Sequence, residues 1–255
     1  MITALMPVKD HHPRLLREAI ESLKSQTSSR WRLVVIVEPD GAGAVASVLG
    51  GDLRDERVEL IENEGRKLAG AFNTGMRCAR TEFVAALLGD DMWAPEAVET
   101  LARHIANRPE VDFFHSARRY VDARGRPIGD VLPSSPAVTL GDFSRGAPVK
   151  HLMCWRRERA LSIGGMDESL NSVGPDDFDF PWSMAEHGAV FGGIPDCLYL
   201  YREHLECPRL TTHLPRHVHK RELARMLRKH GVGPLRTRLK VLKASHTYMR
   251  RCLYP

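Results

Sequence analysis

Two adjacent carboxylates, Asp90 and Asp91, closely follow a run of six apolar residues that begins at Phe83. An apolar run of this length, without polar alternation, is typical of a strand covered on both faces of a parallel sheet. Ligands bind just beyond the carboxyl ends of such strands, where paired carboxylates can hold a divalent cation and, through it, the phosphates of a nucleotide. The alternative is that the two acids only complement the dipole of a helix opened by Pro95.

Polar residues also follow two other predicted strands. Glu38 and Asp40 come after the strand Trp31–Val37, where they could accept hydrogen bonds from a ribose or a base N–H, although Pro-Asp-Gly is also a favourable turn. Gly65 allows the chain to pass close to a ligand, and a helix that begins near Lys67 offers free backbone N–H groups. A second acidic cluster, at residues 176–179, opens a further predicted helix.

The elements that carry these residues alternate regularly from residue 2 to about residue 107. Strands are predicted at Ile2–Val8, Trp31–Val37, Arg57–Glu62 and from Phe83, with helices between them. The helix from Pro13 has apolar residues at three- and four-residue spacing, which indicates one buried face. This alternation predicts an α/β fold with a Rossmann-like, mostly parallel central sheet flanked by helices.

The rhythm changes after Val111, and the second half is predicted to contain shorter elements. We expect two strands at Val111–Ser116 and Arg118–Asp122, a long loop at Leu132–Pro148 and a strand at Val149–Trp155. A helix follows the acidic cluster, and two closing strands are predicted at Ala189–Ile194 and Cys197–Tyr201. The loop is rich in Pro, Ser and Gly, as is typical of a segment over a binding site.

The bulk composition is that of a globular α/β protein with an appendage. The chain has 255 residues, 43% of them hydrophobic and 27% charged. Its first residues lead directly into a strand and lack the basic segment of a signal peptide, and the five cysteines are scattered without a C-x-x-C pair. We therefore expect a cytoplasmic protein.

The charge is distributed unevenly along the chain. The net charge is +5, but the segment from Pro208 to Pro255 holds 13 Lys or Arg residues and one acid, Glu222, so the first 207 residues carry about −7. Two basic helices are predicted there, at His217–Lys229 and Pro234–Tyr254. Three interpretations remain open: a helical pair packed on the acidic body, a surface for anionic lipid headgroups at the inner face of the membrane, or a homodimer contact.

Four stretches together resemble family-2 glycosyltransferases of the GT-A fold, over about residues 2–205. The first is Pro7-Val8-Lys9-Asp10, and the second is Asn63-x-Gly65 followed by Ala-Phe-Asn-Thr-Gly at residues 71–75. The third is Leu-Leu-Gly-Asp-Asp at residues 87–91 with Pro95, and the fourth is Gly-Gly-Met-Asp-Glu at residues 164–168 followed by Asp-Asp-x-Asp at 176–179. Leu88 stands where the family has the first Asp of its D-x-D pattern, and Phe72 stands where Arg is usual.

The resemblance implies transfer of a sugar from a nucleotide-sugar donor, with UDP favoured, to a hydroxyl-bearing acceptor with inversion, as in a hexosyltransferase. Mn²⁺ or Mg²⁺ would neutralise the leaving diphosphate, since hard oxygen ligands suit these ions. Asp177 is the candidate general base and Asp176 the second choice, because crowded carboxylates raise one another's pKa; the alternative is helix capping. The candidate metal residues are Asp90, Asp91 and His204. The candidate nucleotide-binding residues are Pro7, Val8, Asp10, Glu38, Asp40, Lys67, Asn73 and Asp90.

The predicted organisation is a glycosyltransferase domain at residues 1–207, with a nucleotide-sugar half at 1–95 and an acceptor and catalytic half at 96–207, and a basic extension at 208–255. Acceptors could be glycans, lipid-linked sugars or small molecules. A sugar-1-phosphate nucleotidyltransferase would need a Gly-rich basic loop after the first strand, which is absent. Nucleic-acid binding is not expected, because aromatic residues are not interleaved with the basic run. A GT-A fold that only binds its ligands is the other alternative.

Overall fold

The structure is a computed structural model that describes residues 1–9, 11–170, 176–203 and 215–253. Its first half alternates strands and helices, as the sequence predicts. The strands are β1 (Ile2–Val8), β2 (Trp31–Val37), β3 (Val58–Glu62) and β4 (Phe83–Ala86). The helices are α1 (Pro13–Lys24), α2 (Ala42–Leu49), α3 (Lys67–Cys78) and α4 (Ala97–Asn107), and short 3₁₀ helices lie at Pro39–Gly41 and Gly50–Arg54.

The second half contributes more strands and smaller helices to the same body. The strands are β5 (Met92–Trp93), β6 (Phe113–Val121), β7 (Pro127–Leu132), β8 (Met153–Arg156) and β9 (Phe191–Arg202). The helices are α5 (Leu140–Phe143), α6 (Arg157–Ser162), α7 (Asp176–Glu186), α9 (Arg216–Lys229) and α10 (Pro234–Leu253).

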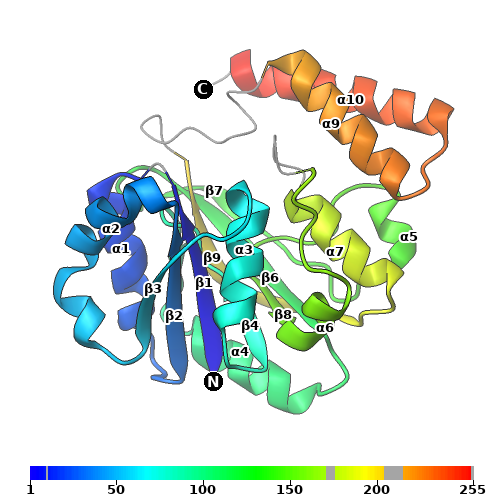
Figure 1. Ribbon diagram of the computed structural model, residues 1–255. Coiled ribbons are helices and arrows are strands. Elements are labelled where there is room, and N and C mark those ends of the chain that lie inside the picture. The colour runs from blue at the N-terminus through cyan, green and yellow to red at the C-terminus, as the bar shows by residue number, and fades with distance from the viewer. Residues whose placement is uncertain (10, 171–175, 204–214, 254–255) are drawn as a thin grey trace.

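The described strands form one nine-stranded sheet in the order β3-β2-β1-β4-β8-β6-β9-β5, with β7 paired to β6 (Figure 1). β1, β2, β3 and β4 run parallel, and β6 and β9 run parallel to each other. β8 lies antiparallel between β4 and β6, so β6 and β9 point in the same direction as β4. The predicted fold class, α/β with helices around a central sheet, is confirmed.

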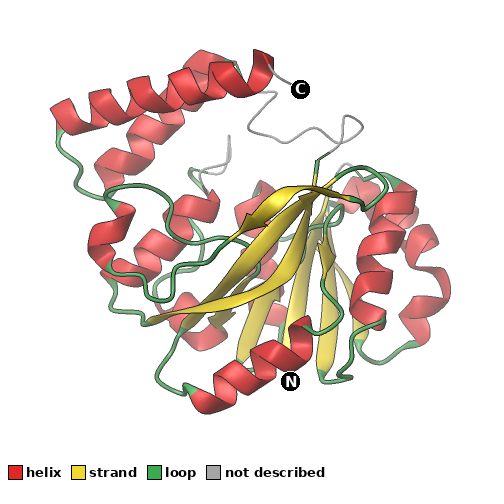
Figure 2. Ribbon diagram, turned by 180° about the vertical axis from the view of Figure 1, so that it is seen from behind, coloured by secondary structure: helices red, strands yellow, loops and turns green. Residues whose placement is uncertain are grey.

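Helices cover both faces of the sheet because residues along its strands alternate between two cores (Figure 2). In β1, Ala4 and Met6 face a core that includes apolar residues of α1, α2 and α4. Leu5 faces the opposite core, to which α3, α6, α7 and α9 contribute. Both faces of β1 are therefore buried, which explains its mostly apolar sequence.

Several predicted boundaries were wrong in the second half. The two strands expected at Val111–Ser116 and Arg118–Asp122 are the single strand β6, and the two closing strands are the single strand β9. The register between β6 and β9 shifts on both sides of Ala117, so bulges absorb the polar interruption without ending either strand. The expected loop at Leu132–Pro148 contains α5, whose Thr139 and Asp142 form a capping box.

The basic C-terminal segment forms α9 and α10, close to the predicted ranges (Figure 1). Met226 and Leu227 of α9 are buried in the core on the α7 side of the sheet. The predicted division into 1–95, 96–207 and 208–255 stays a prediction. Within the described segments, no helix has both the length and the apolar character that crossing a membrane requires.

Candidate functional site

The carboxyl ends of β1, β2, β3 and β4 meet at one edge of the sheet, the upper edge in Figure 1. Pro7 and Val8 lie at the end of β1, where Val8 is paired with Val37 of β2. Glu38 and Asp40 follow β2 directly, and Asp90 and Asp91 follow β4. Topology therefore gathers these predicted residues at the edge where parallel sheets bind ligands.

Asp91 is a buried anchor of the turn after β4. Its side chain accepts hydrogen bonds from the Tyr199 hydroxyl (Oδ2, 2.7 Å) and from the Arg202 backbone N–H (Oδ1, 2.7 Å), and only 1% of the residue is exposed. Burial, and then the charge of Asp90, raises the pKa of Asp91 well above its ordinary value. Asp91 thus ties the turn to the end of β9, and its predicted role as a metal residue stays a prediction.

Arg202 fixes the backbone of the same turn from the side of β9. Its side chain is fully buried, and its Nε donates to the carbonyl oxygen of Asp90 at 2.7 Å. Nη1 donates to the carbonyl oxygen of Ala123 at 3.0 Å, and Nη2 lies 2.7 Å from a carboxylate oxygen of Glu18 in α1. One guanidinium therefore joins three segments around Asp90, whose side chain is half-buried.

The loop between β3 and α3 is held by Asn63, which is buried. Asn63 donates from Nδ2 to Glu38 Oε1 at 2.9 Å and accepts a hydrogen bond from Gly65 N–H at its Oδ1, also at 2.9 Å. Lys67 is exposed at the start of α3 and has a positive φ of 54°. The predicted residues Glu38 and Lys67 are thus linked through this loop, because Asn63 also contacts the Lys67 carbonyl oxygen.

Asn73 connects α3 to the segment that carries Gly-Gly-Met-Asp-Glu. Its Nδ2 donates to the Met166 carbonyl oxygen and to Glu168 Oε1, both at 2.9 Å, and its Oδ1 accepts from Met166 N–H at 2.8 Å. The other oxygen of Glu168 accepts from the Arg66 N–H at 2.8 Å. Asn73 and Glu168 therefore join the two halves of the chain; a direct contact of Asn73 with nucleotide stays a prediction.

Gly165 makes this connection sterically possible, and its replacement provides a test. A Cβ at Gly165 would lie 2.3 Å from Asn73 Oδ1, whereas a Cβ at Gly164 would meet open space; both glycines have positive φ, 76° and 88°. We expect Gly164→Ala to cost about 1–2 kcal/mol in the free energy of unfolding and Gly165→Ala about 1–3 kcal/mol more. Thermal unfolding of the two variants measures the difference, and equal stabilities would contradict the assigned contact.

The acidic cluster begins α7 with its three carboxylates in different surroundings. Asp176 is buried, and burial followed by the charge of Asp177 raises its pKa to about 7. Asp177 is exposed. Asp179 is buried and accepts hydrogen bonds from Lys229 Nζ at 2.8 Å and His230 Nε2 at 2.9 Å, which attaches α7 to α9.

The candidate metal residues are only partly placed. Asp10 and His204 lie outside the described residues. Among the residues that are described, no group of three or more His, Cys, Asp and Glu side chains converges as a metal site. The carboxylate of Asp90 nevertheless fits a Mg²⁺ or Mn²⁺ ion, since Mg²⁺ is usually bound by one or two carboxylates together with substrate phosphates and waters.

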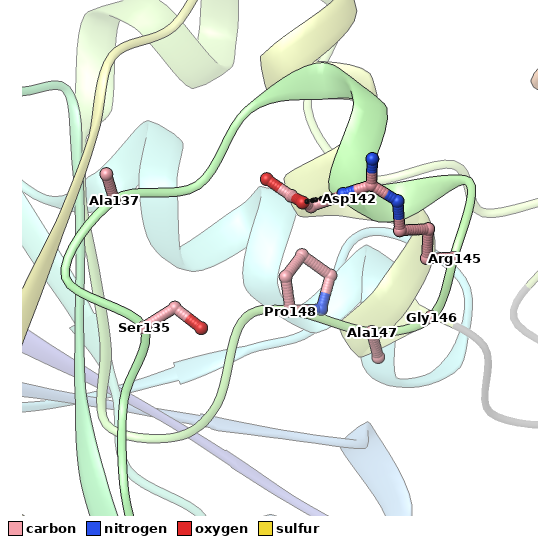
Figure 3. Close-up of a pocket in the computed structure, with 7 residues that line it drawn as sticks. All are labelled: Ser135, Ala137, Asp142, Arg145, Gly146, Ala147 and Pro148. Carbon is pink, nitrogen blue, oxygen red and sulfur yellow. Dashed lines mark hydrogen bonds and ion pairs between the residues drawn. The ribbon is translucent and has the colours of Figure 1, made fainter.

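Two cavities lie beside these elements. One, of about 370 Å³, is an open hollow beside α5, with Arg145 paired to Asp142 (Figure 3); it is lined by Ser135, Ala137, Asp142, Arg145, Gly146, Ala147 and Pro148. None of its lining residues was predicted for the site. The other, of about 540 Å³, is lined by Asn63, Glu64 and Thr74 among others, at the junction of β3 and α3. This second cavity adjoins the loop that links Glu38 to Lys67.

Sequence reasoning assigned no role to Glu168, Tyr199 or Arg202. Glu168 lies in a stretch that already carried the family resemblance, so its position was an available signal. The partners of these residues were not, because Arg66 is separated from Glu168 by 102 residues and Asp91 from Arg202 by 111. Only the folded chain shows that these side chains hold the predicted ones in place.

Comparisons with known sequences show the family of the chain. Residues 3–151 match the family "Glycosyl transferase family 2". The chain is 25% identical to the putative glycosyltransferase EpsE of Bacillus subtilis over 74% of its own length and 69% of EpsE. It is 24% identical to an uncharacterized glycosyltransferase of Methanocaldococcus jannaschii over 52% of the chain, and spans about half of that relative (47%).

Similar solved structures have the same fold at low sequence identity. Staphylococcus aureus TarS in complex with UDP-GlcNAc superposes with a TM-score of 0.68 at 14% identity, over 89% of this chain and 66% of that one. The mannosyltransferase PcManGT of Pyrobaculum calidifontis, in complex with GDP-Man and Mn²⁺, gives a TM-score of 0.60 at 20% identity, over 96% and 69%. At these identities the likeness concerns the fold.

Proposed function

Because the chain belongs to glycosyl transferase family 2 and has the GT-A fold, we propose that it transfers a sugar from a nucleotide-sugar donor to an acceptor hydroxyl with inversion. The observation that carries the proposal is the turn after β4. Asp90 lies there at the carboxyl edge of the sheet, and Asp91, Tyr199 and Arg202 hold its backbone in place. A fixed carboxylate at this edge is well placed to act on the diphosphate of a donor.

The donor end of the site is formed by the first half of the chain. Asp90 would hold Mn²⁺ or Mg²⁺, with Asp91 and His204 as the further proposed metal residues, and the ion would supply positive charge against the leaving diphosphate. Pro7, Val8, Asp10, Glu38, Asp40, Lys67 and Asn73 would grip the nucleotide. UDP is the favoured nucleotide of the donor. Structures of this fold were solved with UDP-GlcNAc and with GDP-Man and Mn²⁺.

The acceptor end is formed by α7. Asp177 is exposed at the first turn of this helix and would take the proton from the acceptor hydroxyl as that oxygen attacks the anomeric carbon. Asp176, buried beside it with a pKa raised to about 7, is the second candidate for the base. In a single displacement the base must face the donor from the side opposite the leaving group.

A thermal-shift panel tests donor binding. Wild-type protein is mixed with UDP, GDP, dTDP or CMP, each with and without Mn²⁺. Ligand that binds the folded state raises the melting temperature, by an amount that corresponds to about 2.7 kcal/mol at a hundredfold excess over Kd. We expect one of the four nucleotides to raise the melting temperature, and only in the presence of Mn²⁺. If none of the four raises the melting temperature, the proposal of a nucleotide-sugar donor is contradicted, and the fold would serve another binding role.

For the basic segment we propose contact with an anionic membrane surface, which places the protein at the inner face of the membrane. Leu235, Leu239 and Leu242 follow one face of α10 and are 72%, 60% and 54% exposed. Arg236, Arg238 and Lys240 lie between these leucines in sequence, and Lys243 directly follows Leu242. Exposed leucines flanked by basic side chains are the pattern of a helix that lies in a headgroup layer.

Vesicle co-sedimentation measures this contact. We expect wild type to sediment with vesicles that contain about a third anionic lipid and not with neutral ones. Leu235→Glu together with Leu239→Glu should abolish binding, whereas Leu53→Glu, at a leucine of 40% exposure elsewhere on the surface, should not. Sedimentation that is equal for all three proteins would contradict the proposal. A dimer lost only in the double variant would instead assign the leucines to a homodimer contact.

A further inference from the structure

A group of basic and aromatic residues lies beyond the Asp90 turn, on the side of β6 and β9. Arg118 and Tyr120 come from the end of β6, Tyr201 from the end of β9, and Lys150 and His151 from the chain just before β8. β8 runs antiparallel to β4 and β6, so its start lies at the edge where those strands end. All five residues therefore gather at the carboxyl edge that carries Asp90.

Arg118 is held in place by aromatic rings. Its guanidinium carbon lies 5.3 Å from the ring centre of Tyr120 and 5.2 Å from that of Tyr201, distances at which cation–π attraction operates. Nη2 donates to the Tyr120 hydroxyl oxygen at 3.1 Å, and Nη1 lies 3.5 Å from His151 Nδ1. These contacts orient the guanidinium without neutralising its charge.

Lys150 places a second positive charge beside Arg118. Both residues are half-buried, and the pKa of Lys150 is lowered by burial and then by the charge of Arg118. The same ammonium charge contributes, after burial, to the low pKa of His115, which falls to about 4. The two cations repel each other, and their partial removal from water strengthens that repulsion.

No carboxylate of the described residues forms an ion pair with Arg118 or Lys150. Several other half-buried or buried basic groups do have carboxylate partners, whereas half-buried Arg108 and Arg159 donate to backbone carbonyl oxygens instead. Arg156 is paired with Glu82 and Asp112, Lys229 with Asp167 and Asp179, and Arg202 with Glu18. The charges of Arg118 and Lys150 are thus left for an anion that is not part of the described chain.

We propose that Arg118 and Lys150 form a subsite for a phosphate group of the acceptor, an assignment that rests on the proposed glycosyl transfer. A guanidinium presents two parallel N–H donors that match two phosphate oxygens, and an ammonium adds a point charge. A phosphate monoester or diphosphate can carry two negative charges and so matches two cations better than a single carboxylate does. The acceptor class is therefore a phosphorylated, hydroxyl-bearing molecule.

The subsite is close enough to the reaction centre to position such an acceptor. The ring of His151 lies 5.2 Å from that of Tyr199, whose hydroxyl donates to Asp91 beside Asp90. Tyr201 precedes Arg202, which holds the Asp90 carbonyl oxygen. The aromatic side chains of His151 and Tyr199 thus connect the anion subsite to the turn assigned to the donor.

Phosphate binding in the presence of nucleotide tests the assignment. Inorganic phosphate, and acetate as the singly charged comparison, are titrated into the full chain alone and with saturating UDP and Mg²⁺, and binding is followed by ¹H–¹⁵N chemical shifts. We expect phosphate to bind more tightly than acetate with UDP present, and at least about tenfold more weakly to Arg118→Gln and to Lys150→Gln. Arg103→Gln, at an exposed arginine of α4, should bind phosphate like wild type.

Each other outcome has a defined meaning. Displacement of phosphate by UDP would overturn the acceptor assignment and give the subsite to the donor diphosphate. Unchanged binding in both Gln variants, or equal binding of acetate, would overturn the phosphate subsite. Arg118→Lys keeps the charge, so intermediate binding is expected if Arg118→Gln fails to fold. Phosphate binding that depends on Arg118 in a protein that binds no nucleotide would refute the proposed reaction but leave the subsite standing.

Discussion

Replacing Asp177 with Asn should lower the rate of sugar transfer by about 10²–10⁴-fold, the contribution typical of a positioned general base. Asn is nearly isosteric with Asp but cannot accept the proton of the acceptor hydroxyl. Asp177 is exposed at the start of α7, so the fold should tolerate the change. The measurement is the rate of sugar transfer with saturating donor, together with the donor Kd, which should not change. Asp130→Asn, at an exposed carboxylate of β7, is the matched control.

The pH dependence separates Asp177 from its neighbour. The pKa of Asp176 is raised to about 7 because the residue is buried and lies beside Asp177. When Asp176 loses its proton, its negative charge makes Asp177 a stronger proton acceptor. The transfer rate should therefore increase as pH rises through about 7. Asp176→Asn should remove this inflection, and its transfer rate should stay close to the rate of wild type below pH 7. If Asp176→Asn is the more damaging variant, the base is Asp176; if Asp177→Asn retains over a tenth of the rate, the assignment to Asp177 is wrong.

Replacing Arg202 with Met should destabilise the protein by about 3 kcal/mol, which lowers the melting temperature by about 6–12 °C for a domain of this size. The guanidinium is fully buried and serves the carbonyl oxygens of Asp90 and Ala123 and the carboxylate of Glu18. Met fills much of the same volume but leaves both carbonyl oxygens without this donor. Below the melting transition, metal-dependent nucleotide binding should also weaken, because the backbone of Asp90 is no longer fixed.

Two comparisons make the Arg202 result specific. Arg126→Met removes an arginine whose side chain is 70% exposed and paired with Asp122, and should change stability by less than about 1 kcal/mol. Arg202→Lys keeps a charge, but one ammonium cannot reach three segments. Its melting temperature should therefore lie between those of wild type and Arg202→Met. A melting temperature for Arg202→Met within about 2 °C of wild type would contradict the structural role given to this residue.

The first half of the fold was predictable because its signals are local. β1, β2 and β4 are short, mostly apolar runs, β3 places Val58, Leu60 and Ile61 among two glutamates, and the helices have their own periodicity or glycine signals. The second half was less legible. β9 contains Pro195 and Asp196, which break the apolar pattern, and only pairing with β6 through a shifted register keeps it one strand. β5 has two residues, and nothing in Met92–Trp93 alone indicates its pairing with β9.

The residue types of the site could be predicted from the sequence, but the contacts that hold these residues in place could not. Asp90, Asp176 and Asp177 are visible because acids at the ends of strands or starts of helices form short patterns. The burial of Asp91 depends on Tyr199, which is 108 residues away, and the raised pKa of Asp176 depends on how α7 packs. Likewise, the absence of a described carboxylate beside Arg118 and Lys150 is a property of the folded chain. Sequence spacing carries no information on such long-range contacts.

The most direct test of the central claim is nucleotide binding by wild type and Asp90→Asn, measured as the shift in melting temperature with and without Mn²⁺. The amide of Asn cannot replace the charge of a carboxylate ligand, whereas the fold should be kept because Asp91 and Arg202 hold the turn. We predict a shift for one nucleotide in wild type that requires the metal and is lost in Asp90→Asn. A metal-dependent shift of equal size in both proteins would contradict the assignment of Asp90 to the metal and the donor diphosphate.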